Sequence, residues 1–146
     1  MSMKYTIYII RHQKPGQYMN CISKQELNNT KSMYEKIKPL QIGRVFTRYP
    51  TTQNNHIRPL QTASNLCTFM GQNIELCNEV KDLPNYITTN VLVVWNHSDI
   101  KYILEKYNMS GWFEWPENDY DGCLMINEYG WEYDHSFFKS STCCWL

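Results

Sequence analysis

Two arginines and two histidines lie at the ends of apolar stretches or at the start of a helical segment, positions where folded chains commonly bind small anions. Arg11 and His12 directly follow an apolar stretch, and His97 ends a second one. Arg58 opens a segment with helical periodicity. A guanidinium group binds tetrahedral oxyanions through paired, charge-assisted hydrogen bonds, and a neutral imidazole can attack phosphorus and carry it covalently. Because no metal-binding carboxylate accompanies these side chains, they predict a phosphate pocket with no metal and no other cofactor.

Alternating strands and helices are expected to bring these four residues together. Residues 5–10 (YTIYII) and 91–95 (VLVVW) are β-branched and aromatic runs, typical of strands buried on both faces. Periodicity, caps and turn residues predict the other elements: helices at 23–37 (starting with a capping box of Ser23 and Glu26), 58–70 and 98–107 (capped by Ser98 or Asn96), a strand at 44–47, and a hairpin of strands 123–128 and 131–138.

This order of elements predicts an α/β fold, a three-layer sandwich with a mainly parallel central sheet and a C-terminal antiparallel hairpin. In such sheets, ligands bind beyond the carboxyl ends of the parallel strands, where loops and helix amino termini converge. Arg11, His12 and His97 follow predicted strands and Arg58 opens a helix. All four are therefore expected at one edge of the sheet.

Length and composition narrow the class of protein. A chain of 146 residues suits a single domain spanning 1–146. Its 14 basic and 14 acidic residues cancel, so no net field favours nucleic acid or an anionic membrane as a partner. The sequence shows neither a signal-peptide pattern nor an apolar run of membrane-spanning length, and its six cysteines include no C-x-x-C pair. These features predict a cytoplasmic protein with reduced thiols.

Three ordered motifs resemble those of the histidine phosphatase superfamily, the phosphoglycerate-mutase-like enzymes. Residues 9–13 (IIRHQ) match the family's apolar strand followed by Arg-His-Gly, except that Gln13 replaces the glycine. Residues 58–63 (RPLQTA) match its second motif fully, and residues 91–97 (VLVVWNH) match its apolar strand ending in histidine. Ser98 and Asp99 replace the glycines that normally follow. The resemblance covers most of residues 5–105, and the late hairpin is similar to that of the short, phosphohistidine-phosphatase-like members.

The resemblance implies a role for each pocket residue. His12 would be the nucleophile, Arg11 and Arg58 the phosphate clamps, and His97 the second imidazole of the pocket. The proton donor is left open between Glu79, which lies between the second and third motifs, and Asp99, or no acid at all; Glu75 and Asp82 are neighbours of Glu79. His56 and His135 are expected to be structural or exposed.

Two functions follow from these roles. The first is a metal-independent phosphatase that acts on a phosphomonoester or phosphoprotein through a phosphohistidine intermediate on His12. The alternative is a catalytically degenerate member that binds a phosphorylated ligand or a protein, suggested by Gln13 and by the replaced glycines at 98 and 99. A mutase is less expected, because typical mutases are longer and carry lid insertions.

Substrate contacts are expected from residues 14–21 and 112–121, although Trp112, Trp115 and Tyr120 are interpreted as cover for the core. Neither the substrate nor the oligomeric state follows from the sequence.

Overall fold

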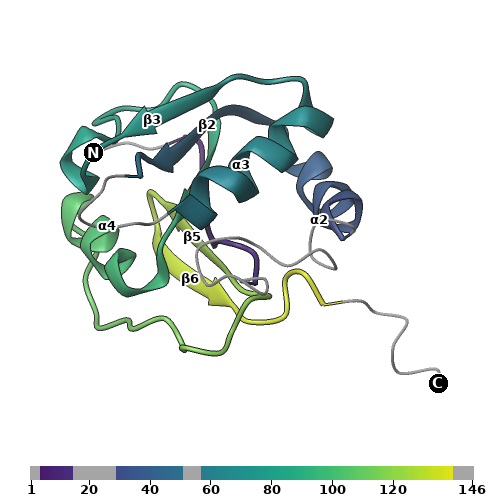
Figure 1. The fold of residues 1–146 in the computed structure, drawn as a ribbon. Coiled ribbons are helices and arrows are strands. Elements are labelled where there is room, and N and C mark those ends of the chain that lie inside the picture. The colour runs from purple at the N-terminus through teal and green to yellow at the C-terminus, as the bar shows by residue number, and fades with distance from the viewer. Residues whose placement is uncertain (1–3, 15–28, 51–56, 140–146) are drawn as a thin grey trace.

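A single six-stranded sheet organises the chain. The computed structural model describes residues 4–14, 29–50 and 57–139. The strands lie in the order β3-β2-β4-β1-β5-β6 (Figure 1). Their bounds are β1 (Ile7–Arg11), β2 (Ile42–Arg48), β3 (Ile74–Cys77), β4 (Asn90–Trp95), β5 (Cys123–Asn127) and β6 (Gly130–Asp134). The first four strands are parallel, and β5 and β6 pair antiparallel. The predicted fold class is confirmed.

Helices cover both faces of this sheet. In Figure 1, α2 (Thr30–Ile37) and α3 (Ile57–Met70) lie on one side and α4 (Lys101–Lys106) lies on the other. Short 3-10 turns occupy η1 (Lys38–Leu40), η2 (Val80–Asp82) and η3 (His97–Asp99). Among the described residues, no helix is long and apolar enough to cross a bilayer.

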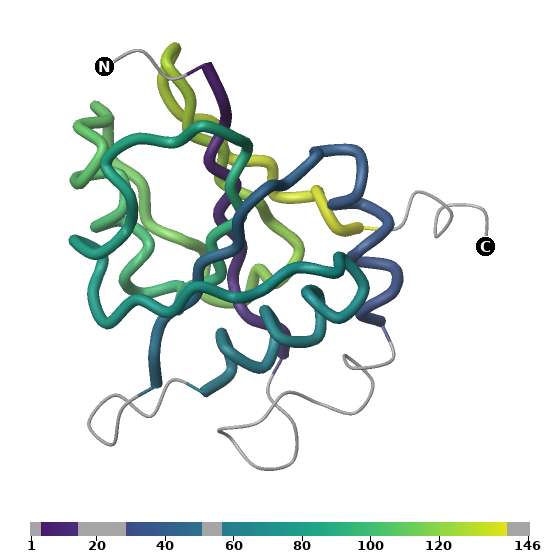
Figure 2. Tube along the Cα trace, turned by 90° about the horizontal axis from the view of Figure 1, so that it is seen from above, coloured from purple at the N-terminus to yellow at the C-terminus, as the bar shows by residue number. Residues whose placement is uncertain are grey.

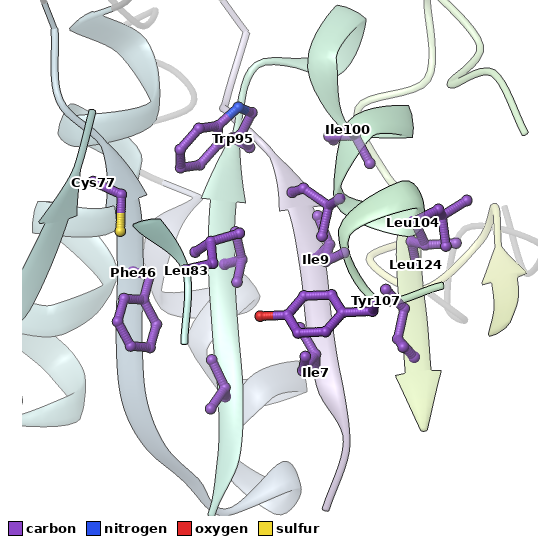
Figure 3. Packing of buried hydrophobic residues seen from close by; sticks show 14 of the residues in the cluster. Ile7, Ile9, Phe46, Cys77, Leu83, Trp95, Ile100, Leu104, Tyr107 and Leu124 are labelled. Carbon is purple, nitrogen blue, oxygen red and sulfur yellow. The ribbon is translucent and has the colours of Figure 1, made fainter. Parts of the chain in front are cut away.

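The two central strands show why the apolar runs are continuous. Along β1, Ile7 and Ile9 belong to the hydrophobic cluster on the α4 face, whereas Ile10 packs in the cluster with α2 and α3. Figure 3 shows the first cluster, in which Tyr107 and Leu104 of the α4 region lie over β1 and β5. A strand with helices on both faces buries every side chain, so its sequence shows no alternation.

Several boundaries differ from the prediction. Strand β3 was not predicted, because this four-residue edge strand is too short for a periodic signal. Arg44 of β2 binds it through two hydrogen bonds to the carboxylate of Glu75, of 2.8 and 2.6 Å. The helix predicted at 23–37 begins at Thr30, since Asn29 is in a turn, and its predicted capping box lies outside the described residues.

The predicted helix 98–107 and hairpin are also shorter. Residues 97–99 form η3, and α4 then starts after Ile100 with no side-chain cap, so the caps expected from Ser98 or Asn96 are wrong. Asn96 instead bonds within the η3 turn. Strand β6 ends at Asp134, where turns replace the last four predicted residues.

Candidate active site

The carboxyl ends of β1 and β4 lie side by side. Arg11 ends β1 and pairs in register with Trp95, the last residue of β4. His12 and His97 therefore leave the sheet from neighbouring strands. Figure 2 shows the end of β1 at the same edge as the end of β2 and the beginning of α3, which carries Arg58. Beyond the effect of burial, the pKa of His12 is lowered by the charges of three neighbours, Arg58, Arg11 and His97. The structure thus brings the four predicted residues into one electrostatic environment.

His12 is held as a neutral imidazole. The side chain is buried, and its Nδ1 lies 2.7 Å from the main-chain oxygen of Gln13. A carbonyl oxygen only accepts, so Nδ1 carries the proton and donates it, which leaves the lone pair on Nε2. Burial is the main cause that lowers the pKa of His12 to about 3; the bond to Gln13 opposes this shift, and Arg58, Arg11 and His97 add to it. His12 is therefore unprotonated on Nε2 at neutral pH.

Gln13, which follows His12, contacts both helices on its face of the sheet. Its main-chain N–H donates to Thr62 Oγ1 at 2.8 Å, which ties the loop to the second motif on α3. Its side chain is buried and lies against Thr30 of α2, with Nε2 3.5 Å from Oγ1. Gln13 is not among the residues with positive φ, so this position does not require the conformational freedom of glycine. Among the described residues, Gln13 is therefore accommodated in place of the motif's glycine by contacts with α2 and α3.

Arg11 is engaged by the segment that precedes β5. Its Nη1 donates to the main-chain oxygens of Glu117 and Asp119, and its Nη2 donates to the Tyr120 hydroxyl at 3.1 Å. The guanidinium carbon lies 3.9 Å from the centre of the Tyr120 ring, which meets the His12 ring edge-on at 6.0 Å. The buried Nε of Arg11 has no hydrogen-bond partner among the described residues.

The aromatic residues of this segment have separate roles. Trp115 is buried in the core, as expected, and its indole N–H donates to the Asp119 main-chain oxygen at 2.8 Å. Trp112 is 79% exposed, so its interpretation as core cover is wrong. The interpretation of Tyr120 as core cover is wrong, because its ring forms a wall of the site.

His97 lies on a turn that a partly buried polar network holds in place. Arg48, at the end of β2, donates from Nη1 to Asn96 Oδ1 at 2.6 Å and forms an ion pair with Asp99. Asn96, itself buried, donates from Nδ2 to Asp99 Oδ2 at 2.9 Å and to Ser98 Oγ at 3.0 Å. Burial lowers the pKa of His97, as does the charge of Arg11. Asp99 is thus engaged in the turn that presents His97.

Glu79 lies apart from the imidazoles. It caps η2, where its main-chain N–H donates to Asp82 at 3.0 Å, and its carboxylate pairs with Lys81 at 3.2 Å. Its side chain is 62% exposed. The turn follows β3, which β2 and β4 separate from β1, a span of about 14 Å at normal strand spacing. Glu79 is absent from the groups whose charges act on His12 and His97.

A different carboxylate, Glu117, lies closer to the site. Its charge acts on the pKa of both His97 and Arg11, in each case opposing the downward shift. Glu117 and His97 also line one hollow of about 430 Å³. The sequence offered no motif around Glu117, only an acidic and aromatic segment, so its approach to the site depends on how residues 113–121 fold back over β1.

The other sequence-predicted groups fall outside the site. His135 is exposed in the turn after β6, whereas His56 lies outside the described residues. Three of the six cysteines are described, and all three are buried free thiols: Cys67, Cys77 and Cys123. Within residues 4–14, 29–50 and 57–139, no three His, Cys, Asp or Glu side chains are grouped so that they could hold a metal ion.

The sheet order, with its helices on both faces, defines a histidine phosphatase-like fold. Two solved structures share it. One is a phosphoglycerate mutase of Plasmodium falciparum, with a TM-score of 0.54 and 13% identity over 90% of both chains. The other is described as a candidate phosphohistidine phosphatase, SixA, of Agrobacterium tumefaciens, with a TM-score of 0.57 and 12% identity over 91% of this chain and 98% of that one. The sequence itself matches no family model and no curated protein.

Proposed function

We propose that this protein is a metal-independent phosphatase that acts on a phosphomonoester or phosphoprotein. The observation that carries the proposal is the bond from His12 Nδ1 to the Gln13 main-chain oxygen, because it directs the free lone pair to Nε2. In the first step the Nε2–P bond forms, the P–O bond to the leaving group breaks, and the leaving oxygen takes a proton. Water then attacks phosphorus, which releases inorganic phosphate and regenerates neutral His12.

Two guanidinium groups and His97 supply the electrostatic part of the proposal. Arg11 and Arg58 would offset the charge of the phosphoryl oxygens, and His97 would donate a hydrogen bond to one of them. Arg11 has its Nε–H and one Nη2–H left after its bonds to the 117–120 segment, so it can contact phosphate without releasing Tyr120.

Two carboxylates are candidates for the proton donor. Glu79 is the residue that the family resemblance suggests, but its partners are Lys81 and the η2 turn. Glu117 lines the hollow that His97 also lines, which favours Glu117. Loss of a general acid slows reactions with poor leaving groups most. Glu117→Gln is therefore expected to slow an alkyl phosphate about 100-fold and p-nitrophenyl phosphate much less, whereas Glu79→Gln is expected to slow neither. The reverse result would assign the proton to Glu79.

The test of the main proposal is turnover that depends on His12. The parent is expected to hydrolyse p-nitrophenyl phosphate and to form an acid-labile, base-stable phosphoprotein on rapid quench with radiolabelled substrate. His12→Ala should lose both signals, and the exposed His135→Ala is the matched control that should keep both. A His12→Ala variant as active as the parent would refute the assignment.

The alternative is a member that binds phosphate or a phosphorylated ligand without turnover. The engagement of Arg11 by Glu117, Asp119 and Tyr120 favours it, because part of the expected clamp is already bonded. It predicts that phosphate or vanadate raises the melting temperature while no product forms. Turnover that disappears with His12→Ala removes this alternative.

A mutase is not excluded by chain length. The Plasmodium falciparum phosphoglycerate mutase aligns over 90% of its own chain. The expectation that a mutase is longer than this chain therefore does not hold for that protein. Mutase activity would appear as phosphoryl transfer from phosphorylated His12 to an added alcohol. The phosphatase proposal expects transfer to water.

A further inference from the structure

The hollow beside His97 is bounded by the start of α4 and the segment before β5. Its lining consists of His97, Ser98, Lys101, Glu114, Trp115, Pro116 and Glu117. Trp115 is buried and forms a fixed wall, whereas the two glutamates are exposed at the opening. With a volume of about 430 Å³, the hollow has room for a group larger than a phosphate.

The hollow is lined by two carboxyl groups, those of Glu114 and Glu117, and by one ammonium group, that of Lys101. Glu114 and Glu117 take part in no ion pair among the described residues, where the ion pairs join Arg44 with Glu75, Arg48 with Asp99 and Lys81 with Glu79. The lone lining cation, Lys101, has its ammonium nitrogen 5.4 Å from the centre of the Tyr102 ring. Glu114 therefore lines the hollow without an ion-pair partner among the described residues.

Two lining residues also belong to the phosphate site. His97 contributes its imidazole to the hollow, and its pKa responds to the charges of Arg11 and Arg58. Glu117 lines the hollow, and its main-chain oxygen accepts a hydrogen bond from Arg11 Nη1. A phosphate held by the two arginines would therefore carry its ester substituent towards the hollow.

We propose that this hollow is the leaving-group subsite and that the carboxylate of Glu114 makes it select substituents with positive charge over substituents with negative charge, while Glu117 serves as the proton donor. The inference rests on the proposed phosphatase function. The substrate class is then a phosphate ester or amide whose leaving group carries an amine, a guanidine or another cation. Bisphosphates and phosphorylated carboxylic acids would place a second anion against Glu114 and bind poorly.

Three small esters of similar size test the inference on the full chain: O-phosphoethanolamine, propyl phosphate and phosphoglycolate, whose substituents are cationic, neutral and anionic. The values of kcat/KM are expected to fall in that order by about fivefold at each step, as is usual for a partly exposed charge pair. Glu114→Gln should reduce the ratio of the first to the last by about fivefold, and Glu114→Lys should reverse the preference. Glu128→Gln, at the β5–β6 turn on the opposite edge, is the matched control and should leave the ratio unchanged.

Protection against thermal unfolding by the same three esters separates this inference from the proposed function. If no ester is hydrolysed but protection follows the order cation, neutral, anion and depends on Glu114, the phosphatase proposal fails and the subsite stands. If the esters are hydrolysed with equal kcat/KM, or if Glu114→Lys leaves the order unchanged, the subsite is overturned. Absence of both turnover and protection overturns both.

Discussion

Stability below neutral pH should report directly on the burial of His12. Burial holds the pKa of His12 near 3 in the folded chain, against about 6.5 when unfolded. Between these values the unfolded chain binds a proton that the folded chain does not bind, so the free energy of unfolding decreases as the pH falls. At pH 5, 1.5 units below the unfolded pKa, this amounts to about 2 kcal/mol relative to pH 8, or a roughly thirtyfold change in the folding equilibrium.

His12→Asn isolates this contribution. The Asn amide N–H can still donate to the Gln13 main-chain oxygen, but the side chain does not titrate. Urea unfolding at pH 5, 6, 7 and 8 can be followed by tryptophan fluorescence, since Trp95 and Trp115 are buried. The parent is expected to lose about 2 kcal/mol more than His12→Asn between pH 8 and pH 5.

The control for this experiment is the exposed His135, in the turn after β6. His135→Asn should retain the pH dependence of the parent. The lowered pKa of His97 adds stability loss of the same sign, but it does so equally in the parent and in His12→Asn. If the parent and His12→Asn lose the same free energy to within about 0.5 kcal/mol, His12 is not buried as a neutral imidazole and the argument for Nε2 fails.

Other substitutions test the contacts around the site. Thr62→Val should lower the free energy of unfolding by about 1–2 kcal/mol because it leaves the buried Gln13 N–H unpaired, whereas Thr68→Val, at an exposed bond on the same helix, should change it by less than about 0.5 kcal/mol in urea titrations. Arg48→Met should release the His97 turn. We expect a lower kcat with KM nearly unchanged, partial recovery in Arg48→Lys, and a shifted His97 resonance in NMR titrations. An unchanged kcat would contradict a positioning role for Arg48. Tyr120→Phe removes one bond to Arg11 but keeps the ring, so phosphate protection should be retained in thermal-shift titrations, while Tyr120→Ala should change it.

Much of the fold could be predicted from local patterns. Strands β1 and β4 were visible because strands buried on both faces need apolar side chains at nearly every position. Helix α3 was visible because Pro59 and Gly71 mark its ends and its apolar residues recur at helical spacing. Strand β3 was not, because it is short and its link to β2 is an arginine–glutamate pair distant in sequence.

The sequence by itself determined which chemical groups meet at the carboxyl edge of the sheet. Each lies at the end of a strand or the start of a helix that its local pattern predicts: Arg11, His12, Arg58 and His97. Only the tertiary structure decided what surrounds them. Glu117 and Tyr120 reach Arg11 across more than one hundred residues of chain, and Arg48 reaches Asp99 across about fifty. Local patterns report the burial and period of an element, whereas such contacts depend on how loops fold back over the sheet, which no local pattern encodes.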